Sequence, residues 1–426
     1  MAVRVRPASQ PTRRFRPGQI RRPAIGAGGT FSALQTNPLF RRLWLASTGY
    51  SLSQWMQNIA LGWLAYELTD SERFVGLVAF AAGFPFVIVS IPGGALLDRF
   101  DRRSVLLISQ ALAAIIATCV AIDVLSGHAT AWHLLLAGFL NGSLQAIITP
   151  SQQSIVPRLV KPHDLQNALG LMSAGGNMTR VFGPALAGTL IAALGTGYPF
   201  ILQAVALSVA FVVIFTSDFP RMPPSTARLG LRVVSEGSRI IAARPDLREL
   251  FMLSALPAML VFPYLSFLNV YAEDVMGIGS EGLGILLASS GVGAVIGGLM
   301  IAATSSSVGM GRRLYVLTFV YCLLILSFAI HPVIWVAIPS LLLAGLVGSY
   351  AFSGNNALIQ QRITDDVRGR VMGTYLLTWG LMPLGALWMG EVGEIWNIRL
   401  ATAAGAAICA IATLLLRMRS QELYAI

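Results

Sequence analysis

Long apolar segments recur along the whole chain, and they decide which folds it can adopt. Of the 426 residues, 55% are hydrophobic and 12% are charged, against about 25% charged in ordinary soluble domains. A helix needs about 20 apolar residues to cross a hydrocarbon core of about 30 Å. The segments are continuously apolar rather than alternating, which favours membrane-spanning helices over a β-barrel.

We predict twelve spans, six on each side of the most hydrophilic internal stretch, which covers about 217–248 and is rich in Arg and Pro. The predicted spans run roughly over residues 43–66, 74–97, 104–125, 131–150, 166–194, 198–216, 249–272, 281–303, 313–331, 333–353, 370–393 and 399–416.

This pattern predicts an all-α membrane protein with twelve transmembrane helices in two six-helix bundles. Its parts are a basic cytoplasmic tail over 1–36, a bundle over 37–217, a cytoplasmic linker over 218–247, a bundle over 248–418 and a cytoplasmic tail over 419–426. Gly, Pro, Arg and Ser dominate the first tail, so it is expected to be disordered.

The basic residues predict the orientation. When the loops are alternated from one side to the other, all but three of the 30 Lys and Arg residues fall on the side of the termini. Arg73 and Arg399 lie on the opposite side, and Arg180 lies inside a span. The positive-inside rule therefore places both termini in the cytoplasm of a bacterial inner membrane. The net charge of +11 reflects this topology, so we expect a lipid bilayer and no nucleic acid as a partner.

The two halves resemble each other at a constant spacing. "GLVAFAAGF" from Gly76 resembles "GLGILLASS" from Gly282, and the Arg102–Arg103 pair has a counterpart at Arg312–Arg313. Each match is weak alone, but the offset is about half the chain each time. Such repeats predict pseudo-symmetric bundles, which are typical of secondary transporters with a substrate site between the halves.

The stretch "GALLDRFDRR", from Gly94 to Arg103, places a dense group of charges between two apolar runs. It resembles the signature loop between the second and third helices of the major facilitator superfamily, roughly G-x-x-x-D-R-x-G-R-[KR]. Asp101 stands where that family usually has Gly. "GPALAG" resembles the family's Gly-Pro motif, which is usually associated with exporters. "ITPSQQSIVPRLV" and "QQRITDDVRGRVMG" resemble the branch that contains macrolide-efflux proteins and siderophore exporters. The resemblance covers about 37–417 and implies the major facilitator fold and transport by alternating access.

The resemblance also implies a cytoplasmic gate. In that family the loop after the second helix lies near the eleventh helix of the other half. The predicted latch consists of Gly94, Asp98, Arg99, Arg102, Arg103, Asp365 and Asp366. The alternative is that these residues only set the topology. Positive-inside bias explains the arginines, but it does not explain Asp98 and Asp101, because acids contribute little to that rule.

Polar residues on the first and fourth spans are candidates for a substrate cavity. Gln54 and Asn58 share a small, polar helical face, whereas Leu45, Met56 and Trp63 form a large apolar face expected to meet lipid. Asn141 and Gln145 repeat the pattern on the fourth span. The resemblance implies that these two helices line the cavity. The alternative is hydrogen bonding between helices of one half.

Arg180 is a charged residue near the middle of a span, where burial costs roughly 2.5 kcal/mol or more. No acidic residue is predicted at the same depth. We expect Gln54 and Asn58 to solvate it if the first and fifth helices touch. Two roles remain open for Arg180, which are structural support within the first half and the binding of an anion.

Aromatic residues in the second half suit a bulky amphipathic substrate. Pro257 and Pro263 are expected to interrupt the seventh helix beside Phe262 and Tyr264, and Trp379 lies at middle depth in the eleventh. The alternative for each aromatic residue is packing in the core or against lipid.

The sequence contains few residue patterns that indicate catalysis or metal binding. The single lysine, Lys161, is not part of a phosphate-binding loop, and the Cys and His residues lack metal-ligand spacing. We therefore expect no enzyme activity, no cofactor and no metal. Proton coupling would need a carboxylate, and the candidates Glu67, Asp123 and Glu391 all lie near the outer ends of spans.

These observations predict a monomeric secondary transporter. It would export a hydrophobic or amphipathic small molecule, such as a drug, a macrolide-like compound or a siderophore-like compound, by alternating access and proton antiport. The alternatives are a lysophospholipid flippase, an uptake facilitator and a non-transporting membrane sensor of the same fold.

Overall fold

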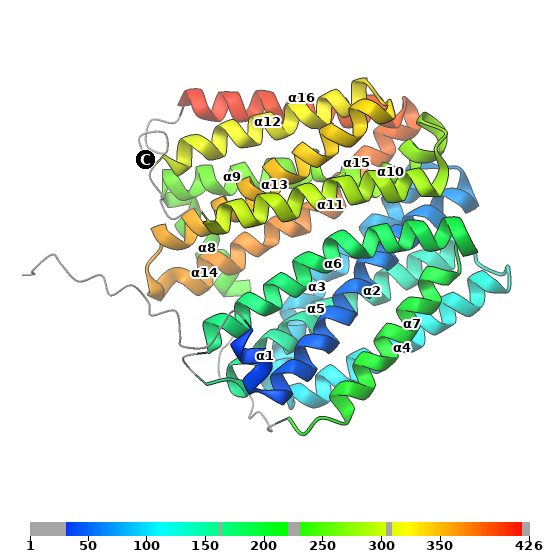
Figure 1. The fold of residues 1–426 in the computed structure, drawn as a ribbon. Coiled ribbons are helices and arrows are strands. Elements are labelled where there is room, and N and C mark those ends of the chain that lie inside the picture. The colour runs from blue at the N-terminus through cyan, green and yellow to red at the C-terminus, as the bar shows by residue number, and fades with distance from the viewer. Residues whose placement is uncertain (1–30, 162–163, 220–230, 304–308, 420–426) are drawn as a thin grey trace, which may run out of the picture.

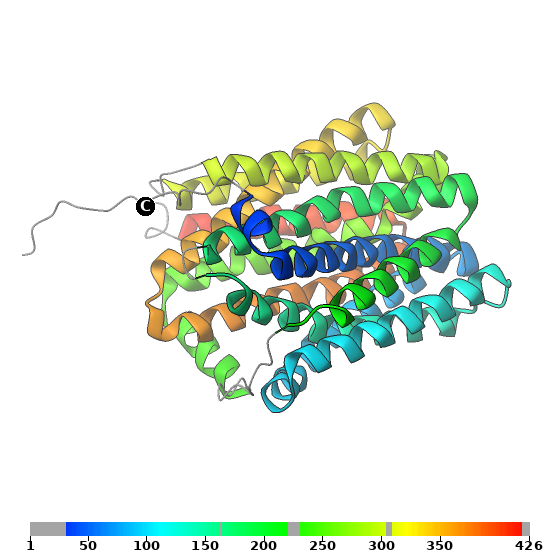
Figure 2. The ribbon, with the colours of Figure 1, turned by 60° about the horizontal axis from the view of Figure 1, so that its bottom comes forward.

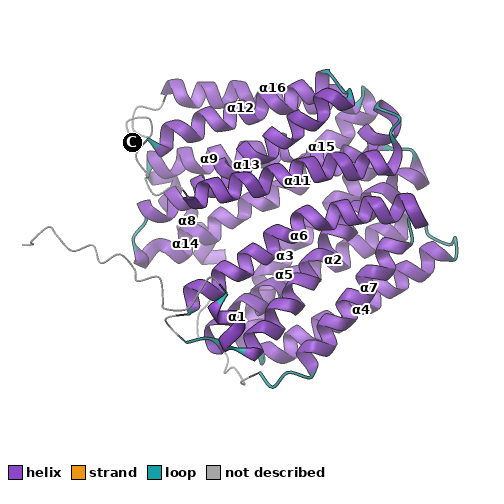
Figure 3. Ribbon diagram, viewed as in Figure 1, coloured by secondary structure: helices purple, strands orange, loops and turns teal. Residues whose placement is uncertain are grey.

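The computed structural model describes residues 31–161, 164–219, 231–303 and 309–419. All the regular structure in these ranges is helical (Figure 3). This confirms the prediction of an all-α fold. The predictions for residues 1–30 and 420–426 lie outside the described residues.

The helices form two groups, one from each half of the chain. The first group comprises α1 (Ser32–Thr36), α2 (Pro38–Thr69), α3 (Glu72–Arg99), α4 (Arg102–Leu125), α5 (Ala131–Leu159), α6 (Leu165–Leu194) and α7 (Tyr198–Phe215). The second comprises α8 (Leu231–Ala243), α9 (Pro245–Leu260), η1 (Phe262–Phe267), α10 (Leu268–Val270), η2 (Tyr271–Val275), α11 (Gly279–Ala303), α12 (Met310–Ile330), α13 (Ile334–Arg362), α14 (Asp365–Leu376), η3 (Leu377–Gly380), α15 (Leu381–Ile395) and α16 (Ile398–Arg419).

Figure 1 shows the second group above the first, with long helices running in similar directions in both. The start of α2 and the end of α16 lie at the same end of the bundle, here called the terminal end. The opposite end, which carries the turns after α2, α4, α6 and α12, is called the distal end. The view in Figure 2 shows the same two groups from a second direction.

Nine helices within the described ranges are long and apolar enough to cross a membrane. They coincide with nine of the predicted spans. The other three predicted spans correspond to α2, α6 and the α14–α15 segment. α2 is surrounded by four helices of its own half, α6 and α15 pack against helices of the other half, and η3 interrupts the α14–α15 segment. Helices surrounded by protein need small and polar residues more than lipid-facing ones do, which lowers their mean hydropathy.

Local sequence explains several helix ends. Asn37 caps α2, because its side-chain oxygen accepts a hydrogen bond of 3.1 Å from the backbone N–H of Phe40. Asp101 caps α4 in the same way, with 3.0 Å from its Oδ2 to the Ser104 nitrogen. Asp101 therefore has a structural role at the position where the related signature usually has Gly.

The structure corrects several predicted boundaries. A helix, α1, lies inside the predicted tail 1–36, and Ala33 at its start is fully buried. The linker 218–247 contains α8, which packs on α14. The helices α5 and α13 continue well beyond the predicted limits of 150 and 353, because hydropathy marks the lipid boundary, whereas a helix can continue into polar surroundings.

Two predicted spans are interrupted. The seventh breaks after α9 into η1, α10 and η2, as Pro257 and Pro263 led us to expect. The eleventh, predicted as continuous over 370–393, breaks at η3. Gly380 and Pro383 flank this second break, so the signal was present in the sequence but was not used.

Close contacts between α11 and α13 depend on glycine. A Cβ atom added at Gly297 would collide with the carbonyl oxygen of Leu346, and one added at Gly345 would collide with that of Ser290. On α5, Gly142 approaches the Ala82 carbonyl of α3 in the same way. Small residues let the backbones of membrane helices approach closely, and dispersion contacts and interhelical hydrogen bonds then hold the pairs together.

Candidate functional site at the contact between the halves

The two halves touch mainly through two pairs of helices. α3 packs on α15, and α6 packs on α11. The tightest approaches lie toward the distal end. A Cβ atom added at Gly188 would lie 2.8 Å from the Gly284 Cα, and one added at Gly76 would lie 2.6 Å from the Ala386 carbonyl oxygen. In contrast, α14, the terminal-end part of the same span as α15, packs mainly on α8 of its own half.

Polar contacts reinforce the distal end. Arg73 of α3 pairs with Glu391 of α15 through two contacts, 2.7 and 2.9 Å long. Ser71 donates a hydrogen bond of 2.8 Å to Glu394. These contacts join the first half to the second.

A second pair of polar contacts lies between α2 and the interrupted seventh span. Asn269 donates to the Gly62 carbonyl oxygen over 2.8 Å, and the Tyr66 hydroxyl donates to the Asp274 carboxylate. We call these contacts, together with those of Arg73 and Ser71, the distal lock.

The three candidate coupling carboxylates occupy different settings. Glu391 belongs to the distal lock. Glu67 accepts a hydrogen bond of 2.7 Å from Thr196, and Asp123 pairs with His133 at 2.7 Å, so both contact only their own half. A coupling role for any of them stays a prediction.

Sequence reasoning missed Glu72. This residue begins α3 between Ser71 and Arg73, and its Oε2 is buried with no hydrogen-bond partner in the described part of the chain. Glu394 and Asp274 of the other half act on its charge. It lies closer to the contact between the halves than Glu67 or Asp123. The sequence signal for Glu72 was its position, two residues before the predicted start of the second span.

The predicted latch at the terminal end is described only in part. α3 runs through Gly94, but the side chains of Asp98, Asp365 and Asp366 lie outside the described residues. Arg103 donates a hydrogen bond of 3.0 Å to the Phe215 carbonyl oxygen at the end of α7, within the first half. Arg99 is exposed beside Phe100, at 5.8 Å from the ring centroid, and Arg102 is half-buried. The latch therefore stays a prediction.

Arg180 lies near two aromatic rings, one from each half. Its guanidinium carbon is 5.5 Å from the ring centroid of Trp55 on α2 and 5.5 Å from that of Phe262 in η1. Each such cation–π contact is worth about 0.5 to 2 kcal/mol. Tyr264 and Tyr321 are the ionisable groups that act on its charge, and no carboxylate in the described part of the chain pairs with it.

The expected partners of Arg180 are therefore different from the observed ones. α2 and α6 do touch, as required, but the guanidinium lies against Trp55, which is the neighbour of Gln54 in the sequence. Gln54 is buried with its Nε2 unpaired within the described residues, and Asn58 is exposed. The prediction from the polar face of α2 did not consider Trp55, the aromatic residue next to Gln54 in the sequence.

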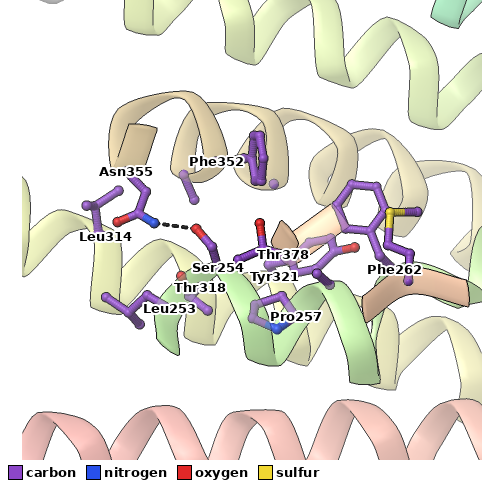
Figure 4. Close-up of a pocket in the computed structure, with 14 residues that line it drawn as sticks. Leu253, Ser254, Pro257, Phe262, Leu314, Thr318, Tyr321, Phe352, Asn355 and Thr378 are labelled. Atoms are coloured by element: carbon purple, nitrogen blue, oxygen red, sulfur yellow. Dashed lines mark hydrogen bonds between the residues drawn. The ribbon is translucent and has the colours of Figure 1, made fainter. Parts of the chain in front are cut away.

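A pocket in the second half begins beside this arginine. Its empty space amounts to about 550 Å³ when the part open to the surroundings is included, but the room in it for the centres of water-sized molecules is only about 30 Å³. Figure 4 shows Phe262 and Tyr321 toward one end and the hydrogen-bonded pair Ser254 and Asn355 toward the other. The lining residues are Leu253, Ser254, Pro257, Ala258, Phe262, Leu314, Thr318, Tyr321, Gly348, Ala351, Phe352, Asn355, Thr378 and Met382. Phe262 is thus shared by the pocket and by the contact with Arg180.

The other predicted cavity residues lie in varied places. Tyr264 is buried and shares a hydrogen bond of 3.3 Å with Ser290 of α11. Asn141 is buried and donates to the Ala137 carbonyl of its own helix, whereas Gln145 is half-buried. The side chain of Trp379 lies outside the described residues. Cavity roles for these residues stay predictions.

The expected lipid-facing side of α2 needs a correction. Met56 is buried, at 1% exposure, whereas Leu45 is 54% exposed. Gln57, which follows Met56 in the sequence, is also buried and accepts a hydrogen bond of 2.7 Å from Gln203 of α7. The helix is surrounded by α3, α5, α6 and α7, so most of its circumference faces protein and a simple two-face interpretation fails.

Two helical halves that contact each other most tightly at one end, with a charged side chain at their contact and a pocket beside it, have the arrangement of a transporter of the major facilitator type. The family model described as "Transmembrane secretion effector" matches residues 28–425. The chain belongs to this family, in the branch of the superfamily that includes siderophore exporters.

Curated relatives agree with this assignment. The staphyloferrin A transporter of Staphylococcus aureus is 25% identical over 351 residues, which cover 82% of this chain and 87% of that protein. The enterobactin exporter EntS of Escherichia coli O1:K1 is 23% identical over 394 residues, which cover 90% and 92% of the two chains.

Solved structures show the same fold. A bacterial homologue of the human lysosomal transporter Spinster superposes with a TM-score of 0.67 at 18% identity, covering 91% of this chain and 96% of that one. A bacterial homologue of the iron transporter ferroportin gives 0.66 at 16% identity, covering 89% and 98%.

Proposed function

We propose that this chain is a proton-driven exporter of an amphipathic, siderophore-like small molecule across the bacterial inner membrane. The observation that carries the proposal is the distal lock together with Arg180, which lies at the contact between the halves, and the adjacent pocket of the second half. If the terminal end is cytoplasmic, as the basic loops indicate, the distal lock closes the outer side. The pocket is then positioned to receive a molecule from the cytoplasm, and rocking of the halves would release it outside.

The names of the relatives favour siderophore-like molecules over macrolides. Both named relatives act on siderophores, and the polar groups at both ends of the pocket suit a molecule with several oxygen donors. Ser254, Asn355, Thr318 and Thr378 supply hydroxyl and amide groups among apolar walls. A chiefly apolar pocket with a few converging polar groups is typical of small-molecule sites.

We propose Glu72 for proton coupling in place of Glu67 and Asp123, because the observed contacts of those two residues lie within their own half. A coupling carboxylate must be exposed to each side in turn. Opening the distal lock would separate Glu72 from Glu394 and Asp274 and expose its buried oxygen to the outer solution. Closing the lock would bring three acidic groups together, which favours binding of a proton to one of them.

Everted membrane vesicles with a fluorescent reporter of the pH gradient test the proposal. The panel contains catecholate and carboxylate siderophores, macrolides, dyes and lysolipids, and the chains are native, Glu72→Gln and, as the control, Glu67→Gln. We expect a siderophore to dissipate the gradient with the native chain and Glu67→Gln, but at least about tenfold less with Glu72→Gln. Proton flux with lysolipids alone would favour a flippase. No flux with any compound, with protein present and folded, would overturn proton-driven export.

The Arg73–Glu391 pair gives a separate prediction. Both side chains are about half exposed, and exposed ion pairs contribute about 0 to 1 kcal/mol. Arg73→Gln and Glu391→Gln should each lower the population of the distal-closed state by up to about fivefold. The double variant should lower the population of the distal-closed state no further than either single variant does, because both substitutions remove the same ion pair.

Spin labels on Leu125 and Ile330 measure this population. These exposed residues end α4 and α12 at the distal end of opposite halves, and the exposed Cys119 is first replaced by Ser. Strictly additive effects of the two substitutions would contradict a direct pair across the halves.

A further inference from the structure

Arg180 has two aromatic neighbours, but its N–H groups form no hydrogen bond within the described part of the chain. A guanidinium carries five N–H donors in its plane. Trp55 and Phe262 lie near the guanidinium but offer aromatic rings and no oxygen acceptor, so its N–H groups can still bind an acceptor from a ligand. The side chain is half-buried rather than fully enclosed, so a small molecule can reach it.

The charge itself also lacks a counter-ion. Protein charges within a membrane span normally pair with one another or mark a pathway for substrate. The ionisable groups that act on Arg180 are two tyrosines and no carboxylate. A purely structural arginine would be expected to bind carbonyl or carboxylate oxygens of its own half, and the described residues provide none for it.

The position of Arg180 connects it to both halves and to the pocket. It lies on α6 of the first half, it contacts Phe262 of the second, and Phe262 lines the pocket. A molecule whose anionic group binds Arg180 could therefore place its apolar part along Phe262 and Tyr321. Such a molecule would bridge the two surfaces that separate during transport.

We propose that Arg180 binds the carboxylate of an amphipathic substrate, and that the pocket beside Phe262 receives the apolar part of the same molecule. A planar guanidinium matches a carboxylate in a two-point contact. A cationic amphiphile would be repelled, and a neutral one would leave the charge unpaired. The inference rests on the proposed transport function and specifies the substrate class of its site.

The test measures binding rather than transport. Purified chains in detergent are titrated with dansyl-labelled undecanoic acid and with its primary amide, which has the same tail and no charge. The native chain should bind the acid about tenfold more tightly than the amide. In Arg180→Gln the acid should lose this advantage, while the affinity for the amide stays within about twofold.

Two further variants control for charge and geometry. Arg180→Lys keeps the charge but not the two-point contact, so it should retain a preference for the acid of about threefold. Arg158→Gln removes an exposed guanidinium of α5, at the terminal end of the first half, and should keep the native ratio. Size-exclusion profiles and thermal midpoints check that each variant is folded.

Three outcomes would overturn the proposal. They are equal affinity of the native chain for acid and amide, no binding of either probe to the native chain, and an equal loss for both probes in Arg180→Gln. The first two need no variant, so they remain decisive if Arg180→Gln does not fold. A preserved acid preference without proton flux in vesicles would instead contradict the proposed transport while leaving the site intact.

Discussion

Gly188→Leu is expected to hold the two halves apart at the distal end and so to disfavour the state described here. A side chain at this position of α6 would meet the backbone of Gly284 and the carbonyl oxygen of Ser280 on α11. Backbone atoms cannot move aside by changing rotamer. Overpacking costs about 1 to 3 kcal/mol, so the distal-closed population should fall by roughly five- to 150-fold.

The labels on Leu125 and Ile330 report the change directly, as a shift of their distance distribution to longer values. The matched control is Gly176→Leu on the same helix, because a Cβ atom there meets nothing within 4 Å. Besides the apolar cluster that the halves share, each half has a buried apolar cluster of its own, so the folded yield of Gly188→Leu should stay near native. An unchanged distance distribution in this variant would show that the contact between α6 and α11 does not keep the distal end closed.

Gly297→Ala is expected to destabilise the second half strongly for a change of one methyl group. The added Cβ would collide with the carbonyl oxygen of Leu346 and would lie 3.0 Å from the Cα of Leu346. Separation of α11 from α13 would reduce dispersion contacts along both helices. We expect the free energy of unfolding to fall by about 1 to 3 kcal/mol.

The adjacent Gly298→Ala provides the control. Its nearest contact would be the Ser349 Oγ at 3.7 Å, an ordinary van der Waals distance. Both substitutions gain about 1 kcal/mol of helix propensity, so the difference between the two thermal unfolding midpoints isolates the collision. Equal midpoints would contradict the close packing of α11 on α13.

Much of the fold could be predicted from the sequence because a bilayer restricts the choice of structure severely. Apolar runs identified most spans, and the two prolines identified the break in the seventh. The break at η3 was missed, although Gly380 and Pro383 carried the signal. The polar ends of α5 and α13 were missed because hydropathy reports the lipid boundary and not the end of a helix.

The candidate site was less predictable, because its contacts join residues far apart in the chain. Arg180 stood out by charge alone, yet its neighbours Trp55 and Phe262 come from helices of different halves. Its expected polar partners were wrong for a physical reason. The polar face of α2 was identified from one helix, whereas the direction of each side chain depends on the four helices packed around it.

The sequence by itself determined that this chain forms membrane-spanning helices in two related halves, since the lengths of its apolar runs and the placement of its basic residues allow few other folds. Only the tertiary structure decided which end of the bundle is closed, which acids face the other half and what surrounds Arg180. Those properties depend on helices meeting at specific depths and rotations, and hydropathy and charge patterns specify neither.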